Sequence, residues 1–163
     1  MKWLENLAKA CGVLAAAFLV ALALVILAQI ISRMFGRLVP SADDFAAWAM
    51  ASSVFLGLPY AMLRGDHIRV TLVLQVLPKS LHYGYEILAT LIALVVSAWG
   101  SYYCIIFVYE SFARNELAPG MLPVPMWMPQ IGMPIGLVLF TLMLARRLVM
   151  SVRGQPLEES ENG

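Results

Sequence analysis

Four stretches of the chain are apolar and long enough to cross a lipid bilayer, and they constrain the fold more than any other feature. They run over about 10–31, 45–63, 87–109 and 126–145. About 20 helical residues, rising 1.5 Å each, cross a hydrocarbon core about 30 Å thick. A lone strand in lipid would leave its peptide groups without hydrogen bonds. The sequence therefore predicts an all-α integral membrane protein with four transmembrane helices, in a single domain over residues 1–163.

The composition excludes several other classes of protein. The chain is 61% hydrophobic and 13% charged, whereas soluble domains are about 45–50% apolar and about 25% charged. Its net charge of +1 provides no basic surface for phosphates, so we expect no nucleic-acid partner. The first apolar stretch exceeds the roughly 7–15 residues of a signal-peptide core, and we expect it to be retained.

The distribution of lysine and arginine predicts the orientation. One group lies at the chain ends and in the loop after the second span: Lys2, Lys9, Arg64, Arg69, Lys79, Arg146, Arg147 and Arg153. The other two loops contain only Arg33, Arg37 and Arg114. The positive-inside rule then places both termini in the cytoplasm. The acidic tail over about 154–163, expected to be flexible, has little weight in this rule.

The loop after the second span contains an apolar segment, about 66–78, that is too short to cross the membrane. Its apolar residues alternate as in a strand, while its polar residues recur every four positions as on a helix. A strand at the membrane surface would lack a partner, so we predict a short amphipathic helix along the cytoplasmic interface. A simple hydrophobic connector is the alternative. The helix would include His67, Ile68, Arg69, Val70, Leu72 and Leu74.

Charged residues gather in the two loops on the opposite side of the membrane. Pro119, Gly120, Pro123 and Pro125 stiffen the second of these loops. Ser41 has an acidic residue three positions later and fits an N-cap. The charges either dock a partner protein or only cap helices and pair in water. The candidates are Arg33, Arg37, Asp43, Asp44, Glu110, Arg114 and Glu116.

The central parts of the spans contain no charged residue. Ionisable groups there usually mark a transport or proton pathway. The few polar residues, such as Ser101 and Thr141, are interpreted as interhelical hydrogen bonders. Cys11 and Cys104 are poorly placed to pair, and His67 and His82 lie outside the spans. The sequence therefore predicts no catalytic residue, no cofactor and no metal site.

Small residues at helical spacing predict close helix packing. Such residues let helix backbones approach each other in lipid. Trp99 lies in the middle of the third span, which indicates a protein contact rather than a lipid anchor. Each small residue and Trp99 packs either within the chain or against a larger protein. Because the chain has no transport or catalytic site of its own, we interpret it as an accessory subunit. The candidates are Ala49, Ser53, Gly57, Ala61, Trp99, Gly132 and Gly136.

Several short motifs occur in a specific order. Asp43-Asp44 opens the second span, and Arg64-Gly65-Asp66-His67-Ile68-Arg69-Val70 follows it. Pro125-Met126-Trp127-Met128-Pro129 precedes the last span, which ends in Arg146-Arg147. Over roughly residues 14–147 this order resembles the small integral membrane subunit, of the DctQ type, of tripartite ATP-independent periplasmic (TRAP) transporters. Aspartate stands at 43 and 44 where that family commonly has glutamate, which keeps the charge.

The resemblance implies a role in a larger complex of the bacterial inner membrane. Such subunits do not transport alone. They bind a large multispanning subunit that carries the substrate and sodium sites, and a periplasmic substrate-binding protein delivers the substrate, often an organic acid. An ion gradient, rather than ATP, supplies the energy, and uptake is a sodium-coupled symport. The alternatives are a stand-alone small transporter, and a membrane scaffold or assembly factor unrelated to transport.

Overall fold

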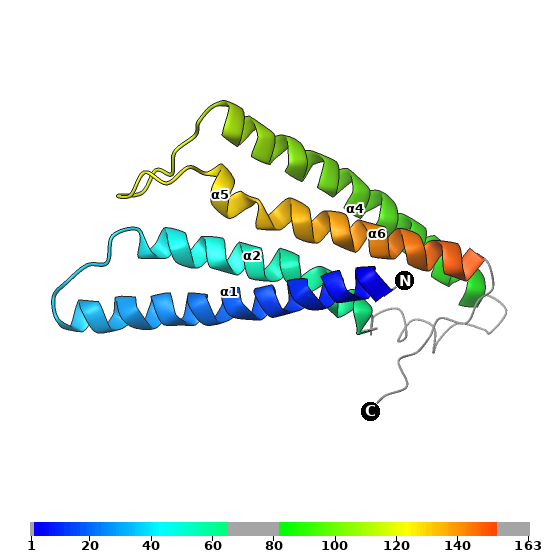
Figure 1. The fold of residues 1–163 in the computed structure, drawn as a ribbon, viewed down its shortest axis with the longest axis horizontal. Helices are drawn as coiled ribbons and strands as arrows, with labels where there is room; N and C mark the ends of the chain where they lie inside the picture. Colours follow the sequence, from blue (N-terminus) through cyan, green and yellow to red (C-terminus); the bar gives the residue numbers. More distant parts are fainter. Residues whose placement is uncertain (1, 65–81, 153–163) are drawn as a thin grey trace.

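The computed structural model describes residues 2–64 and 82–152, and each of the four apolar stretches forms a helix in it (Figure 1). The long helices are α1 (Lys2–Met34), α2 (Ala42–Leu63), α4 (His82–Ala113) and α6 (Gly132–Val152). All four are long and apolar enough to cross a membrane, α6 together with the short α5 (Trp127–Gln130). The prediction of four helices long and apolar enough to cross a membrane is confirmed. The predicted interfacial helix (66–78) and acidic tail (154–163) lie outside the described residues.

Two prolines shape the helices locally, because proline has no amide hydrogen to donate. Pro134 cannot donate to the carbonyl of Gln130, and the helix is interrupted between α5 and α6 at this point. Pro59 lies inside α2 and is fully buried. It leaves the carbonyl of Phe55 without its usual helical donor.

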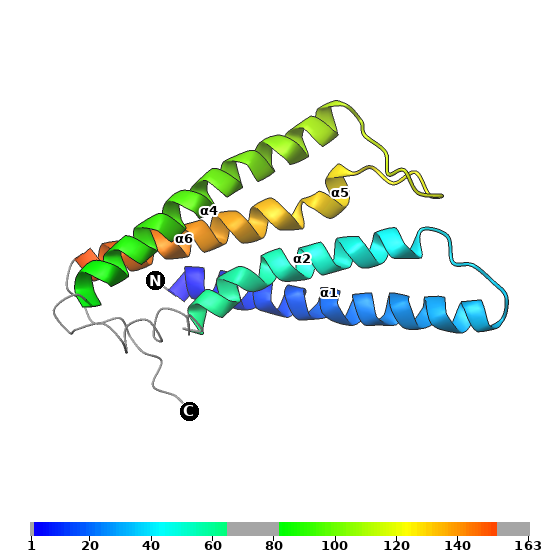
Figure 2. The ribbon, with the colours of Figure 1, turned by 180° about the vertical axis from the view of Figure 1, so that it is seen from behind.

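The helices lie side by side in the order α1, α2, α6, α4 (Figures 1 and 2). Helix α2 packs between α1 and α6, and α6 packs between α2 and α4. Within the described residues, α4 contacts neither α1 nor α2. The four helices therefore form an open row, in which α1 and α4 are the edges, rather than a closed four-helix bundle.

The row is packed most tightly at the end where α1 begins and α6 ends, here called the terminus end. A cluster of buried side chains joins three helices there: Leu4, Ala8, Met62, Met143 and Leu144. The guanidinium of Arg146 also lies 3.3 Å from the carboxylate of Glu5, which ties α6 to α1. The helices spread apart toward the opposite end, the loop end, which holds residues 35–41 and 114–126 (Figure 2).

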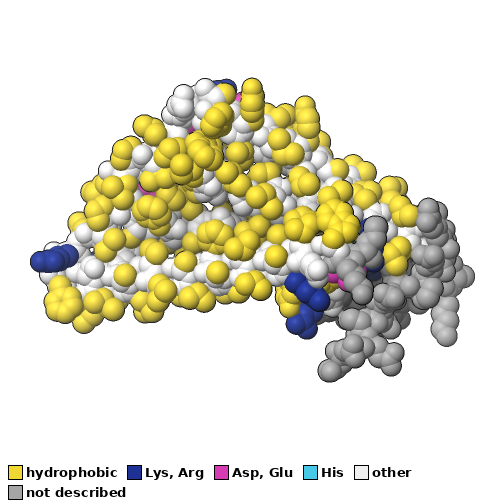
Figure 3. Space-filling model, in the orientation of Figure 1, with side chains coloured by type: hydrophobic (Ala, Val, Ile, Leu, Met, Phe, Trp, Pro, Cys, Tyr) yellow, Lys and Arg dark blue, Asp and Glu magenta, His cyan; other side chains and the backbone are white. Residues whose placement is uncertain are grey.

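Hydrophobic side chains cover most of the visible face of the row (Figure 3). Long apolar residues remain exposed along both edge helices, among them Leu24 on α1 and Val96 on α4. A lipid environment accommodates such a surface, because lipid tails are as apolar as these side chains.

Candidate interaction surfaces

The structure separates the seven charged candidates into three places at the loop end. Arg114, just after α4, lies 3.2 Å from the carboxylate of Glu110 and 3.9 Å from that of Glu116. Ser111 also donates a hydrogen bond to Glu116 over 3.2 Å. We call these three charged residues the Arg114 cluster. Such exposed ion pairs stabilise a protein by only about 0–1 kcal/mol each.

The second place is the start of α2. The side-chain amide of Gln29 donates a 2.9 Å hydrogen bond to Asp43, which links α1 to α2. Asp44 lies against Gly120, where an added Cβ would overlap its carboxylate. Both acidic residues are also in the first turn of α2, where the helix dipole favours negative charge. These contacts lie within the chain.

Ser41 occupies the N-cap position of α2, but the predicted side-chain cap is wrong. Its backbone is left-handed, with φ of 55°, and its side chain makes no capping hydrogen bond. Instead its hydroxyl oxygen accepts a hydrogen bond from the backbone amide of Leu122, 3.2 Å away. The sequence does not show this, because the competing donor comes from a loop 81 residues further along the chain.

That second loop folds back over the start of α2. Ala118 donates to the carbonyl of Val124 over 2.8 Å, and Met126 donates to that of Glu116 over 2.9 Å. The two arms of residues 116–126 are thereby paired into a narrow turn. Gly120 contacts α2 in this turn, at a position with no space for a side chain.

The third place is the tip of the hairpin formed by α1 and α2, which extends past the end of α4 (Figure 1). Arg33 and Arg37 are exposed there, and within the described residues neither has an ion-pair partner. Apolar side chains surround them and are also exposed: Met34, Phe35 and Leu38. We call these five residues the hairpin tip. The sequence analysis noted the charges but missed the apolar residues beside them.

The glycine pair at the start of α6 lies against α2 of the same chain. A Cβ added at Gly132 would lie 3.0 Å from the hydroxyl oxygen of Ser52. A Cβ added at Gly136 would overlap the carbonyl of Phe55 and lie 2.9 Å from the amide nitrogen of Leu56. The carbonyl of Phe55 is the one that Pro59 leaves without its usual helical donor, and it lies directly against Gly136.

The small-residue stripe on α2 does not form one uniform contact face. Ala49 is buried, Ser53 and Gly57 are half-buried, and Ala61 is exposed. A Cβ added at Gly57 would lie 3.9 Å from that of Ala15, so this position faces α1. Sequence reasoning missed the closer contact between these helices, in which Gly12 packs against the ring of Tyr60.

Helices α4 and α6 are joined by hydroxyl groups. The side-chain oxygens of Ser101 and Thr141 lie 3.0 Å apart, within hydrogen-bond distance. The hydroxyl of Ser101 also contacts the carbonyl of Ser97, and that of Thr141 contacts the carbonyl of Leu137. Trp99 lies on the other side of α4 with 66% of its surface exposed, so it makes little contact within the chain.

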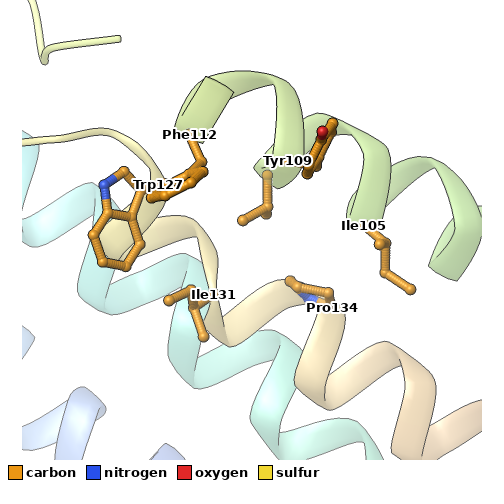
Figure 4. A pocket seen from close by; sticks show the side chains of 7 residues that line it. Ile105, Tyr109, Phe112, Trp127, Ile131 and Pro134 are labelled. Carbon is orange, nitrogen blue, oxygen red and sulfur yellow. The ribbon is translucent and has the colours of Figure 1, made fainter. Parts of the chain in front are cut away.

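A groove of about 300 Å³ opens between α4 and the α5–α6 segment (Figure 4). The ring of Trp127 meets that of Phe112 edge to face, with centroids 5.6 Å apart. The groove lining contains no charged side chain. Its lining residues are Ile105, Val108, Tyr109, Phe112, Trp127, Ile131 and Pro134. Across the described ranges, no three histidine, cysteine or acidic side chains gather where they could hold a metal ion.

Comparison with known protein families matches most of the chain. Residues 22–154 match the sequence profile of the family described as "Tripartite ATP-independent periplasmic transporters, DctQ component". No curated protein matches the chain significantly. The match covers most of the chain, including all of α2, α4, α5 and α6. With its four apolar helices, this multi-pass membrane protein belongs to the DctQ family of TRAP transporter components.

Proposed function

We propose that this chain is the non-catalytic small permease subunit of a TRAP transporter, which extends the scaffold of a larger multispanning subunit. That subunit would carry the substrate and sodium sites and take up an organic acid by symport. The open row of helices is the observation that carries this proposal. The ion pair of Arg146 with Glu5 and the hydrogen bond of Gln29 to Asp43 lie at the two ends of the row. Between these ends, the described helix contacts use glycines, aliphatic side chains and hydroxyls, and offer no polar path across the membrane.

In this proposal the terminus end of the row faces the cytoplasm of a bacterial cell, and the loop end faces the periplasm. The first residue of α1 and the last of α6 lie at the same end of the row. The excess of lysine and arginine at the chain ends and after α2 favours this orientation. The hairpin tip and the Arg114 cluster then face the periplasm.

Among the loop-end charges, the hairpin tip is our preferred docking site for the substrate-binding protein. Arg33 and Arg37 are exposed and carry positive charge that no described acidic group neutralises. The charges of the Arg114 cluster are already paired with one another. Unpaired charge beside exposed apolar side chains suits a transient protein contact, where charges mainly raise the association rate.

Charge reversal tests this choice of docking site. Arg33→Glu with Arg37→Glu should lower uptake at low concentrations of the binding protein, and high concentrations should restore it. Arg114→Glu, at the same end of the protein, is the matched control and should have a smaller effect. Uptake by the Arg33/Arg37 variant equal to that of the wild type, at equal membrane levels, would show that the hairpin tip does not dock the binding protein.

Purification of the tagged chain in a mild detergent tests the proposed function. We expect a single larger protein with many membrane spans to be recovered with it in a fixed ratio. A stand-alone transporter would be recovered without any partner. A scaffold unrelated to transport would bring down proteins other than a large permease, and either result would contradict the proposal.

A further inference from the structure

The edge helix α4 carries a cluster of three aromatic side chains on its free surface. Trp99, Tyr102 and Tyr103 are 66%, 61% and 52% exposed. The ring of Tyr103 lies edge-on to both others, with centroid distances of 4.9 Å to Trp99 and 5.4 Å to Tyr102. We call these three residues the α4 aromatic cluster. Trp99 and Tyr103 follow Leu88, Ile92 and Val96 at helical spacing on the face away from α6.

This cluster lies near the middle of the membrane. Ser101, in the same turn, is fourteen residues from Ile87 and twelve from Ala113, the ends of the apolar part of α4. At 1.5 Å per residue, Trp99, Tyr102 and Tyr103 lie about 15 Å or more from either end, while half a hydrocarbon core is about 15 Å. Thr141, which contacts Ser101, is also deep within the apolar part of α6.

Tyrosine and tryptophan usually lie at the membrane interfaces, where their polar groups reach water or headgroups. From the middle of the membrane, these side chains cannot reach either interface. Among residues 2–64 and 82–152, none accepts a hydrogen bond from the indole of Trp99 or the hydroxyls of Tyr102 and Tyr103. Lipid tails have no acceptor either, so exposure to lipid would leave three polar groups unsatisfied.

The other edge helix shows what a lipid-facing surface looks like in the same protein. The exposed large side chains in the middle of α1 are hydrocarbon only: Phe18, Leu19, Val20, Leu24 and Leu27. None of them has a polar group that needs a partner. The two edges of the row therefore differ in chemistry, although both are free in the single chain.

We propose that the α4 aromatic cluster contacts the large permease subunit, which supplies hydrogen-bond acceptors to these side chains at mid-membrane. This inference rests on the proposed function and specifies which surface of the chain makes the contact. A second copy of the chain is a weaker occupant, because its cluster offers only the two tyrosine oxygens as acceptors for three donors. A different protein provides carbonyl, carboxyl or amide acceptors on a complementary helix.

Site-specific photo-crosslinking in membranes tests the inference on the intact complex. The photoreactive amino acid p-benzoylphenylalanine is placed at position 103, and at position 19 of α1 as a control. Leu19 is 57% exposed and one turn beyond Ala15, which faces Gly57 in the middle of α2. We expect a crosslink to the large subunit from position 103 and none from position 19. Crosslinks from position 19 alone, or from position 103 only to a second copy or to lipid, would overturn the inference.

Removal of the hydroxyls provides a second measurement that keeps the aromatic rings. One interhelical hydrogen bond in a membrane changes an association equilibrium constant about threefold on average. Loss of two such bonds in Tyr102→Phe with Tyr103→Phe should therefore reduce recovery of the large subunit about tenfold in stringent detergent. Tyr109→Phe, near the loop end of α4, is the control and should leave recovery unchanged. Equal recovery for the double variant and the control would contradict the inference.

The failure of the inference can be distinguished from the failure of the proposed function. If the wild-type chain recovers no large subunit, the proposed function itself fails. If the wild-type chain recovers the large subunit but position 103 does not crosslink to it, only the inference fails.

Discussion

Helix α6 is held in different ways on its two sides. Toward α2 it presents Gly132 and Gly136, which lie directly against Ser52 and the backbone of Phe55 and Leu56. Toward α4 it presents Leu137 and Thr141, which contact Gly100 and Ser101 through side-chain atoms. The first contact has no space for another atom. The second leaves a groove between α4 and α5–α6 near the loop end.

This difference divides the row into a fixed part and a more adaptable part. Backbone atoms cannot rotate out of the way, so the spacing of α2 and α6 is determined by the glycines. Side chains adjust more easily, and α4 diverges from α6 toward the loop end (Figure 2). We therefore expect the α2–α6 contact to tolerate substitution least, and α4 to adjust when a partner covers its free face.

The largest effect is expected at Gly136. Gly136→Ala should destabilise the chain by about 1–3 kcal/mol, because the added methyl group overlaps the carbonyl of Phe55. Gly84→Ala is the matched control, since no atom of the described residues lies within 4 Å of that position. It should be neutral or stabilising by up to about 1 kcal/mol through helix propensity. Unfolding in a series of sodium dodecyl sulfate concentrations measures both, and equal stability of the two variants would show that the glycine contact does not set the helix spacing.

A smaller effect is expected for the hydroxyl pair between α4 and α6. Ser101→Ala and Thr141→Val, alone and together, form a double-mutant cycle. Their coupling free energy should be about 0.6 kcal/mol, the average for hydrogen bonds between helices in a membrane. The same unfolding measurement provides the free energies of unfolding of the wild type, the two single variants and the double variant. A coupling of zero would mean that the two oxygens, although 3.0 Å apart, do not stabilise this contact.

The smallest effect is expected at Gly57, on the α1 side of α2. Its Cβ position is an ordinary van der Waals distance, 3.9 Å, from Ala15. Gly57→Ala should therefore leave stability unchanged or slightly raised, and it should recover the large subunit as well as the wild type. The sequence alone left open whether Gly57 packs within the chain or against a larger protein. A loss of the large subunit with Gly57→Ala, at normal membrane level, would identify Gly57 as a partner contact.

The sequence predicted the helices well because hydrocarbon imposes a simple rule on length and polarity. Uninterrupted apolar stretches had to be helices, and both prediction and structure place Gly132 and Gly136 at the start of the last one. The ordered motifs also indicated the family that the comparison confirmed. Each of these features depends on residues that are close together along the chain.

Features that depend on distant residues could not be predicted in the same way. A glycine pair shows that something approaches closely, but not that α2 is the approaching helix. The hydroxyl of Ser41 accepts a hydrogen bond from Leu122, which no local pattern indicates. Likewise, the seven loop charges looked like one surface until the fold separated the hairpin tip from the Arg114 cluster. Tyr102 and Tyr103 had a local signal, their position at mid-span, that the sequence analysis applied only to Trp99.

Reconstitution into liposomes tests the central claim most directly. Uptake of the substrate is measured with a sodium gradient and the binding protein, using this chain alone, the large subunit alone, and the two together. Our account predicts uptake only when both membrane subunits are present, because this chain supplies scaffold and contact surface rather than a transport path. Uptake by this chain alone would contradict it.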